Sequence, residues 1–357
     1  MTEPAPPSRR RLGWKAALVC AVLGGALLLV AWPNPERDIR QAIIVALRAE
    51  LTPAMIDRAL DEGDVDGAEL LADAADLAGI ALPQSTADRL RAENTLWKQA
   101  LGKTADCAKG AVMGTASGLA GIVCSVAADM TLLGDVRDAT AELTKPLRGE
   151  EPDSLILGLA AAGIALEVAA PATGGSSMAA KGGTAVLKVA VKSRMIARRL
   201  ADEIGGILSS AVHLGPVKAM SASDLADMPR ASRTLGNAVD MKRLAPLAEA
   251  GTSLGRIYKK ADGATALMVT RTARSLDDVK TAEKLAAIFG KRTGGVLKAL
   301  GAKAFDLVVL ALRLVWALLG LLIGALCWLV SALVALRGMI RLIRRLLRRS
   351  ASLEQPA

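Results

Sequence analysis

The stretch LVWALLGLLIGALCWLVSALVAL, residues 314–336, decides the class of this 357-residue chain. Its twenty-three residues carry no charge. As a helix with a rise of about 1.5 Å per residue they would reach about 34 Å, enough to cross a bilayer with some tilt. Trp316 and Trp328 lie within the stretch. We therefore predict a transmembrane helix within residues 305–336.

A second uncharged run covers residues 16–32. Trp14 and Trp32 bracket it, as in the aromatic belt at a membrane interface. A cleaved signal peptide is the alternative, but no cleavage site of two small residues follows the run. The sequence therefore predicts an uncleaved transmembrane helix over residues 16–32, after a basic cytoplasmic tail over residues 1–15.

Arginines follow the 314–336 run at three- and four-residue spacing, which places them on one helical face. Apolar residues occupy much of the rest, so we predict a basic amphipathic helix and tail over residues 337–357, at an anionic membrane surface. Dense positive charge at both chain ends predicts cytoplasmic termini at a bacterial inner membrane, with a periplasmic middle region. The arginines expected to contact anionic lipid are Arg337, Arg341, Arg344, Arg345, Arg348 and Arg349.

The composition favours helices. Aromatic residues make up 2% of the chain, so a core must be built from Ala, Leu, Val, Ile and Met. Ala and Leu favour helices, whereas strands are enriched in aromatic and β-branched residues. The predicted fold class is all-α, with terminal transmembrane helices and a middle region of helical hairpins.

The middle region divides by charge. Residues 33–153 contain 12 Lys and Arg against 21 Asp and Glu, a net charge of −9, whereas residues 170–304 contain 22 against 10, a net of +12. Such asymmetry indicates two parts that act separately, or two helical layers joined by salt bridges. We predict an acidic helical-hairpin domain over residues 33–104 and a basic helical domain over residues 185–304.

Apolar residues at helical spacing predict helices over 36–51, 65–80 and 85–101 in the acidic part. Between the first two, Thr52 is the expected N-cap and Pro53 the first residue of a further helix.

In the basic part, residues 187–200 predict a helix with five cations. Its partner could be lipid headgroups, a cell-wall polymer or the acidic part, or the cations could simply be solvated. Nucleic acid is excluded as a partner, because aromatic residues for base stacking are almost absent.

Residues 105–170 form a module rich in glycine and alanine. The uncharged run 111–128 has glycines at four-residue spacing, a glycine zipper that permits close helix packing. A second apolar run, 155–166, is too short to span a bilayer alone. The two runs predict either a membrane-inserting hairpin or the buried centre of a soluble helical domain. The glycines predicted for helix packing are Gly110, Gly114 and Gly118 here, and Gly320 and Gly324 in the C-terminal span.

The connector between these runs carries GDVRD at 134–138 and RGEE at 148–151. Together with the Gly/Ser stretch 174–177 and a basic helix from Lys181, this order over about residues 105–195 resembles a group of uncharacterised bacterial membrane proteins. The GDVRD block also resembles the linker modules of polymorphic toxins, although no toxin-type catalytic end follows. The resemblance implies a helical membrane module and indicates no particular activity. Its motif residues are Gly134, Asp135, Arg137, Asp138, Arg148, Gly149 and Glu150.

Motifs for chemistry are lacking. His213 is the one histidine, and Ser209 and Ser210 near it lack the G-x-S-x-G pattern of hydrolases. The Gly/Ser stretch lacks the Gly-Lys-Ser/Thr ending of a phosphate-binding loop, so we predict a linker over residues 171–184. With four scattered cysteines and one histidine, we predict no catalytic, cofactor or metal site and no small-molecule substrate.

The sequence therefore predicts a bacterial inner-membrane protein with a structural or partner-binding role in the cell envelope. Its expected partners are anionic membrane lipids and a helix of a homo-oligomer or another protein. The alternative is a membrane-active protein, pore-forming or toxin-like, that acts through the 111–166 hairpin. A hydrolase that uses Ser209 or Ser210 with His213 is the third hypothesis.

Overall fold

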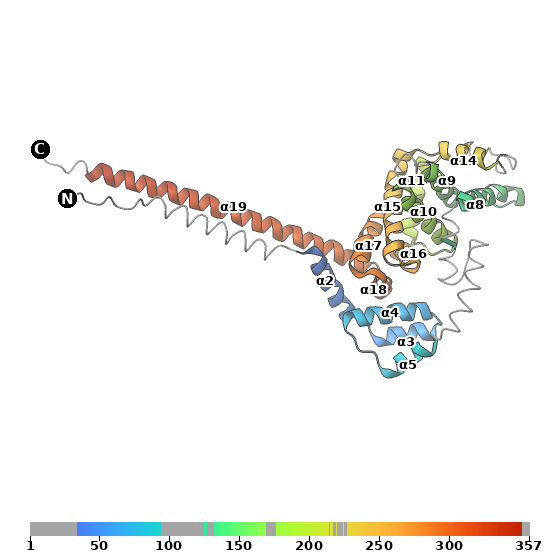
Figure 1. Ribbon diagram of the computed structural model, residues 1–357, viewed down its shortest axis with the longest axis horizontal. Helices are drawn as coiled ribbons and strands as arrows, with labels where there is room; N and C mark the ends of the chain where they lie inside the picture. The colour runs from blue at the N-terminus through green and yellow to red at the C-terminus, as the bar shows by residue number, and fades with distance from the viewer. Residues whose placement is uncertain are drawn as a thin grey trace, which may run out of the picture. The chain divides into compact units, whose positions relative to one another are not determined.

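The computed structural model describes residues 34–93, 125–126, 132–168, 176–213, 215–216, 219, 224 and 227–351 (Figure 1). Within these residues every regular element is a helix, and the one β-type pairing is an isolated antiparallel bridge between Val212 and Val239. The all-α prediction is confirmed. The predicted span at 16–32 and the glycines Gly110, Gly114 and Gly118 lie outside the described residues.

The acidic part forms short helices joined by tight turns, as predicted. These are α2 (Pro35–Glu50), α3 (Pro53–Asp61), α4 (Val65–Ala78) and α5 (Gln84–Glu93). Pro53 opens α3 and Thr52 is its N-cap residue, although the Thr52 side chain makes no capping hydrogen bond. Gly63, at φ +73°, makes the turn between α3 and α4, where an L-residue would be strained.

The glycine-rich module contains α8 (Leu132–Thr144), the 3₁₀ helix η1 (Lys145–Arg148) and α9 (Ser154–Val168). Every residue of α9 from 156 to 166 is buried. A helix that is apolar all round belongs in a protein core or a membrane. In this structure α9 is covered by protein, since it packs on α8, α10, α11 and α14.

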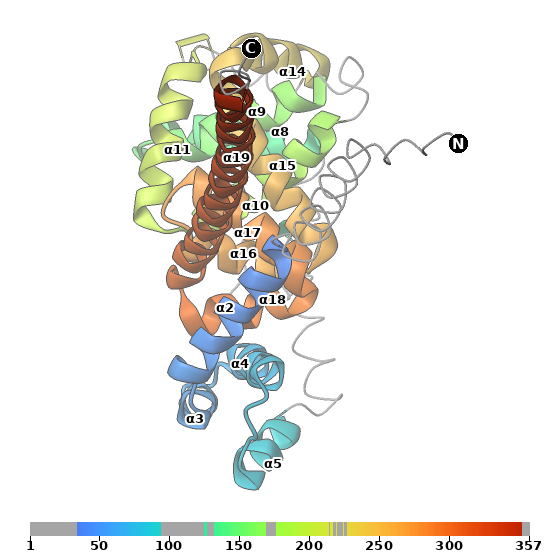
Figure 2. The ribbon, with the colours of Figure 1, turned by 90° about the vertical axis from the view of Figure 1, so that its left-hand side faces the viewer.

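The predicted linker over residues 171–184 is wrong from residue 176 onward, because α10 (Ser176–Lys192) is already helical there. The small residues of this stretch serve close packing. A Cβ atom on Gly183 would lie 1.8 Å from the carbonyl oxygen of Gly251, so the backbone of α10 touches that of α15 (Met241–Lys260). Figure 2 shows α10 and α15 beside each other.

The predicted helix over residues 187–200 is also wrong in its middle. The chain leaves the helix after Lys192, passes through Arg194 at φ +54°, and starts α11 (Arg198–Ala211). Further described helices are α14 (Met228–Asn237), α16 (Gly263–Thr272), α17 (Leu276–Phe289), η2 (Gly290–Arg292) and α18 (Thr293–Leu300).

The acidic and basic parts are joined rather than separate, and residues 39–309 form one compact unit. Helix α4 packs on α18 so closely that a Cβ atom on Gly295 would lie 2.1 Å from the Leu70 carbonyl oxygen. Salt bridges join the two parts: Lys298–Asp64 at 2.6 Å, Arg292–Asp76 at 2.7 Å and Lys303–Glu50 at 3.1 Å. Of the two alternatives for the charge asymmetry, the structure shows bridging between helical layers.

The C-terminal helix α19 (Lys303–Ala351) runs without a break for 49 residues. Within the described residues it is the one helix long and apolar enough to cross a membrane. The segments predicted separately as a span and as an amphipathic helix are one continuous helix up to Ala351. Its residues from 310 onward belong to a second unit with the start of α2.

Candidate functional site

The GDVRD block builds a buried acidic face on α8. Asp135, Asp138 and Glu142 are buried, and their spacing of three and four residues aligns them on one side of the helix. Carboxylates are almost never fully buried unless they are paired. A buried row of three therefore requires cations opposite.

Glu142 pairs with Lys145 of η1 at 2.6 Å, and the cations opposite Asp135 and Asp138 come from α10. Lys181, Lys188 and Lys192 are spaced by seven and four residues and also share one helical face. Lys181 and Lys188 are each 1% exposed, among the largest fully buried side chains in the described part of the chain.

The two faces meet in a network that we call the buried charge cluster. Lys188 Nζ lies 2.6 Å from Asp135 Oδ1 and 2.7 Å from Asp138 Oδ2. Lys192 Nζ lies 2.6 Å from Asp138 Oδ2. Lys181 Nζ lies 3.9 Å from Asp135 Oδ2 and also pairs with Glu167 at the end of α9. The cluster comprises Asp135, Asp138, Glu167, Lys181, Lys188 and Lys192.

Helix α9 makes room for the cluster at Gly163. A Cβ atom there would lie 2.5 Å from Asp135 Oδ2, so the missing side chain of Gly163 leaves the space that this carboxylate fills. The carboxylate is thereby held against the backbone of the uncharged, buried stretch 156–166 of α9.

Burial and charge act against each other on the pKa values of the cluster. Burial alone would raise the pKa of Asp138, but ion pairs with Lys188 and Lys192 outweigh it and hold the pKa below its ordinary value. Burial lowers the pKa of Lys181; nearby Asp135 opposes this shift, and the positive charge of Lys188 adds to it. Asp138 is therefore ionised at neutral pH. Lys181 loses its proton at a lower pH than a lysine in water does.

The remaining motif residues have structural positions. Gly149 ends η1 in the left-handed conformation at φ +74°, with exposed Arg148 and Glu150 beside it. Arg137 lies at the edge of the cluster, with Nη2 3.2 Å from Asp138 Oδ1. Gly134 is buried near the start of α8.

Sequence reasoning found the two aspartates as a motif but did not assign the lysines of α10 to them. The signal was present, because the 3–4 spacing of the carboxylates and the 7–4 spacing of the lysines each define one helical face. The hypothesis that the basic helix pairs with the acidic part holds for Lys188 and Lys192.

The other predicted site residues are not brought together. Gly320 and Gly324 have open space beside them, so helix packing there stays a prediction. Arg337, Arg341 and Arg344 are exposed.

The three residues of the hydrolase hypothesis each contact backbone carbonyls. Ser209 Oγ donates to Gly206 and Ser210 Oγ to Ile207, at 2.9 and 2.8 Å. His213 Nδ1 lies 3.3 Å from the Ala238 carbonyl oxygen. These contacts do not include the serine–histidine hydrogen bond on which that chemistry depends.

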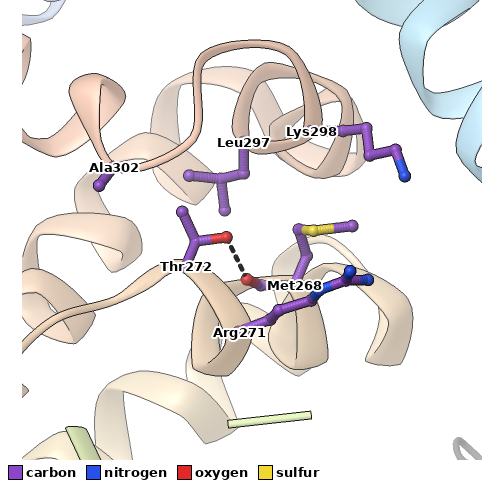
Figure 3. A pocket seen from close by; sticks show the side chains of 6 residues that line it. All are labelled: Met268, Arg271, Thr272, Leu297, Lys298 and Ala302. Atoms are coloured by element: carbon purple, nitrogen blue, oxygen red, sulfur yellow. Dashed lines mark hydrogen bonds between the residues drawn. The ribbon is translucent and has the colours of Figure 1, made fainter. Parts of the chain in front are cut away.

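An open hollow of about 450 Å³ lies between α16, α18 and the turn at Ala302 that precedes α19 (Figure 3). Its Lys298 ammonium is already paired with Asp64, and the Thr272 hydroxyl donates to the Met268 carbonyl oxygen at 2.7 Å. Arg271 and Leu297 also line it. Among the described residues, no group of three or more His, Cys, Asp or Glu side chains is placed to hold a metal ion.

Comparison with known proteins gives no relative. The chain matches no protein-family model, no curated protein and no solved structure. The buried charge cluster and the exposed apolar helix α19 are therefore the features from which function must be argued.

Proposed function

We propose that this chain is a bacterial inner-membrane protein with a structural or partner-binding role in the cell envelope. The observation that carries the proposal is the exposed apolar surface of α19. Trp316, Leu321 and Trp328 are 70%, 71% and 74% exposed, in a run of 23 uncharged residues. Soluble proteins rarely leave so large a contiguous apolar surface in water, whereas a bilayer covers it.

Arginine-bearing turns continue α19 beyond the apolar run. The exposed side chains of Arg337, Arg341 and Arg344 supply positive charge where the helix would leave the bilayer. This charge supports a cytoplasmic C-terminus and contacts with anionic headgroups. The unbroken helix supports a segment that continues the direction of the span rather than one that turns along the membrane surface.

The unit of residues 39–309 supports a scaffold or binding role. Its acidic and basic parts are tied by ion pairs and by glycine-mediated helix crossings. Such a body presents a fixed surface, as a partner-binding protein requires.

Topology reporters test the proposal. Alkaline phosphatase and a cytoplasm-only fluorescent protein are each fused after Ala231 and after Ser350. We expect phosphatase activity at 231, fluorescence at 350, and both fusions in the membrane fraction after alkaline extraction. Recovery of the chain in the soluble fraction would overturn the proposal, and fluorescence at 231 would overturn the periplasmic middle region.

The membrane-active alternative predicts dye release from liposomes by a fragment of residues 105–170. The burial of α9 beneath four helices supports the scaffold role instead, because an inserting helix would first have to leave that core.

A further inference from the structure

We propose that Lys188 and Asp135 form an intramolecular amide bond, with Asp138 as the proton-transfer group. The bond would join α10 to α8 covalently, between residues 53 positions apart in the sequence. This is a self-modification site within the buried charge cluster, independent of the proposed membrane role.

The reacting atoms are already in contact. Lys188 Nζ is 2.6 Å from Asp135 Oδ1, and the carbon that it would attack, Asp135 Cγ, is one bond from that oxygen. The same nitrogen is 2.7 Å from Asp138 Oδ2. One amine nitrogen therefore touches both the acceptor carboxyl and a second carboxylate able to take its protons. Groups held in such contact react as if at very high concentration.

The reacting groups are buried, out of contact with bulk water. Lys188 is 1% exposed and both aspartates are buried, and removal from water penalises ammonium and carboxylate alike. Lys192 and Lys181 flank the reacting groups, Lys192 against Asp138 and Lys181 against Asp135.

The position of Asp135 is fixed from the other side. Its carboxylate fills the space beside Gly163, and α9 is apolar and buried from residue 156 to 166. Water that could hydrolyse the product is therefore kept out, and the carboxyl carbon has little freedom to move away from the amine.

The reaction balances without any added reagent. One proton passes from the Lys188 ammonium, by way of Asp138, to the Asp135 carboxylate. The nitrogen lone pair then attacks Asp135 Cγ and forms the C–N bond. Asp138 takes a second proton from nitrogen and gives it to the departing hydroxyl, which leaves with the electrons of the C–O bond as water. Ammonium and carboxylate become one secondary amide and one water molecule, and nothing is oxidised or reduced.

Mass spectrometry of the purified full-length chain tests the proposal. We expect a mass lower than that of the sequence by one water molecule. After denaturation and proteolysis, we expect one branched peptide in which Lys188 is joined to Asp135. The full sequence mass, with Lys188 open to amine labelling in the denatured chain, would overturn the proposal, and so would a link between any other pair.

Three variants assign the roles. Lys188→Arg should lose the link, because a guanidinium is not a nucleophile at neutral pH. Asp138→Asn keeps the shape of the side chain but cannot relay protons, so we expect the linked fraction to fall at least tenfold. Lys280→Arg, the matched control, changes a lysine that pairs with Glu249 outside the cluster and should link fully. A fully linked Asp138→Asn chain would overturn the role of Asp138. Because the wild-type mass decides first, a poorly folding variant does not obscure the result.

Discussion

The crossing of α10 and α15 at Gly183 allows a sharp test of how the 39–309 unit is packed. We consider Gly183→Ala, the smallest possible change. In an unpacked helix it would stabilise the fold by about 0.5–1 kcal/mol, because alanine loses less backbone freedom than glycine. The structure predicts the opposite sign.

The magnitude follows from one distance. The new Cβ atom would lie 1.8 Å from the Gly251 carbonyl oxygen, whereas Cβ atoms essentially never approach another atom within 3.0 Å. The helices would have to separate by more than an ångström, since the obstacle is backbone and has no rotamer to change. Overpacking of this kind costs about 1–3 kcal/mol. Alanine's gain of about 0.5–1 kcal/mol offsets part of this cost, so we expect a net destabilisation of up to about 2.5 kcal/mol.

The matched control is Gly206→Ala on α11, where a new Cβ atom would have no neighbouring atom within 4 Å. There the helix propensity acts alone, and we expect a gain of about 0.5–1 kcal/mol. Urea unfolding of the full chain in mild detergent, followed by circular dichroism, measures both. The midpoint should fall for Gly183→Ala and rise for Gly206→Ala, with unchanged slopes. A Gly183→Ala midpoint equal to or above wild type would refute the close crossing.

Three further predictions address the charge cluster, a helix start and the membrane span. The pKa of Asp138 in the folded chain lies below its ordinary value of 3.8. Its contribution to stability is therefore complete above that value and is lost as the pH falls through the lower, folded pKa. Asp138→Asn should be less stable at neutral pH and should flatten the acid side of the stability curve, which urea midpoints between pH values of about 2 and 6 measure. Asp240 accepts hydrogen bonds from the Lys242 and Arg243 backbone amides at the start of α15, so Asp240→Ala should cost about 0.5–2 kcal/mol in the same assay, and equal stability would contradict the cap. Leu326→Arg places a charge near the centre of the apolar run, which costs about 2.5–3.5 kcal/mol for insertion into the bilayer. It should reduce the share of the chain that stays in the membrane fraction after alkaline extraction. Val45→Arg, at an exposed apolar residue of α2, should not.

Local signals in the sequence predict the helix starts and the apolar helices. Pro53 opens a helix because its ring fixes the backbone angle, and the uncharged run at 155–166 predicts a helix covered either by protein or by lipid. These features depend on neighbours in the chain, so they can be read from the sequence.

Tertiary contacts are what the sequence conceals. The small residues around Gly183 suggest a linker, because glycine weakens an isolated helix, and nothing local reveals that α15 touches it there. Only the acidic side of the charge cluster can be recognised in the sequence, because its ion pairs are tertiary contacts. Asp135 and Asp138 stand out as a block, but their lysine partners lie on another helix some fifty residues away.

The packing of α4 against α18 limits how early α4 can reach its final packing during synthesis of the chain. Asp64 and Lys298 are 234 residues apart, so the partner of α4 is synthesised about 10–50 s after α4 itself at ordinary translation rates. During that interval the side of α4 that will face Gly295 lacks the cover of α18. Helix α4 is thus made early and packed late, and a nascent chain halted before residue 293 would present that side to chaperones and proteases.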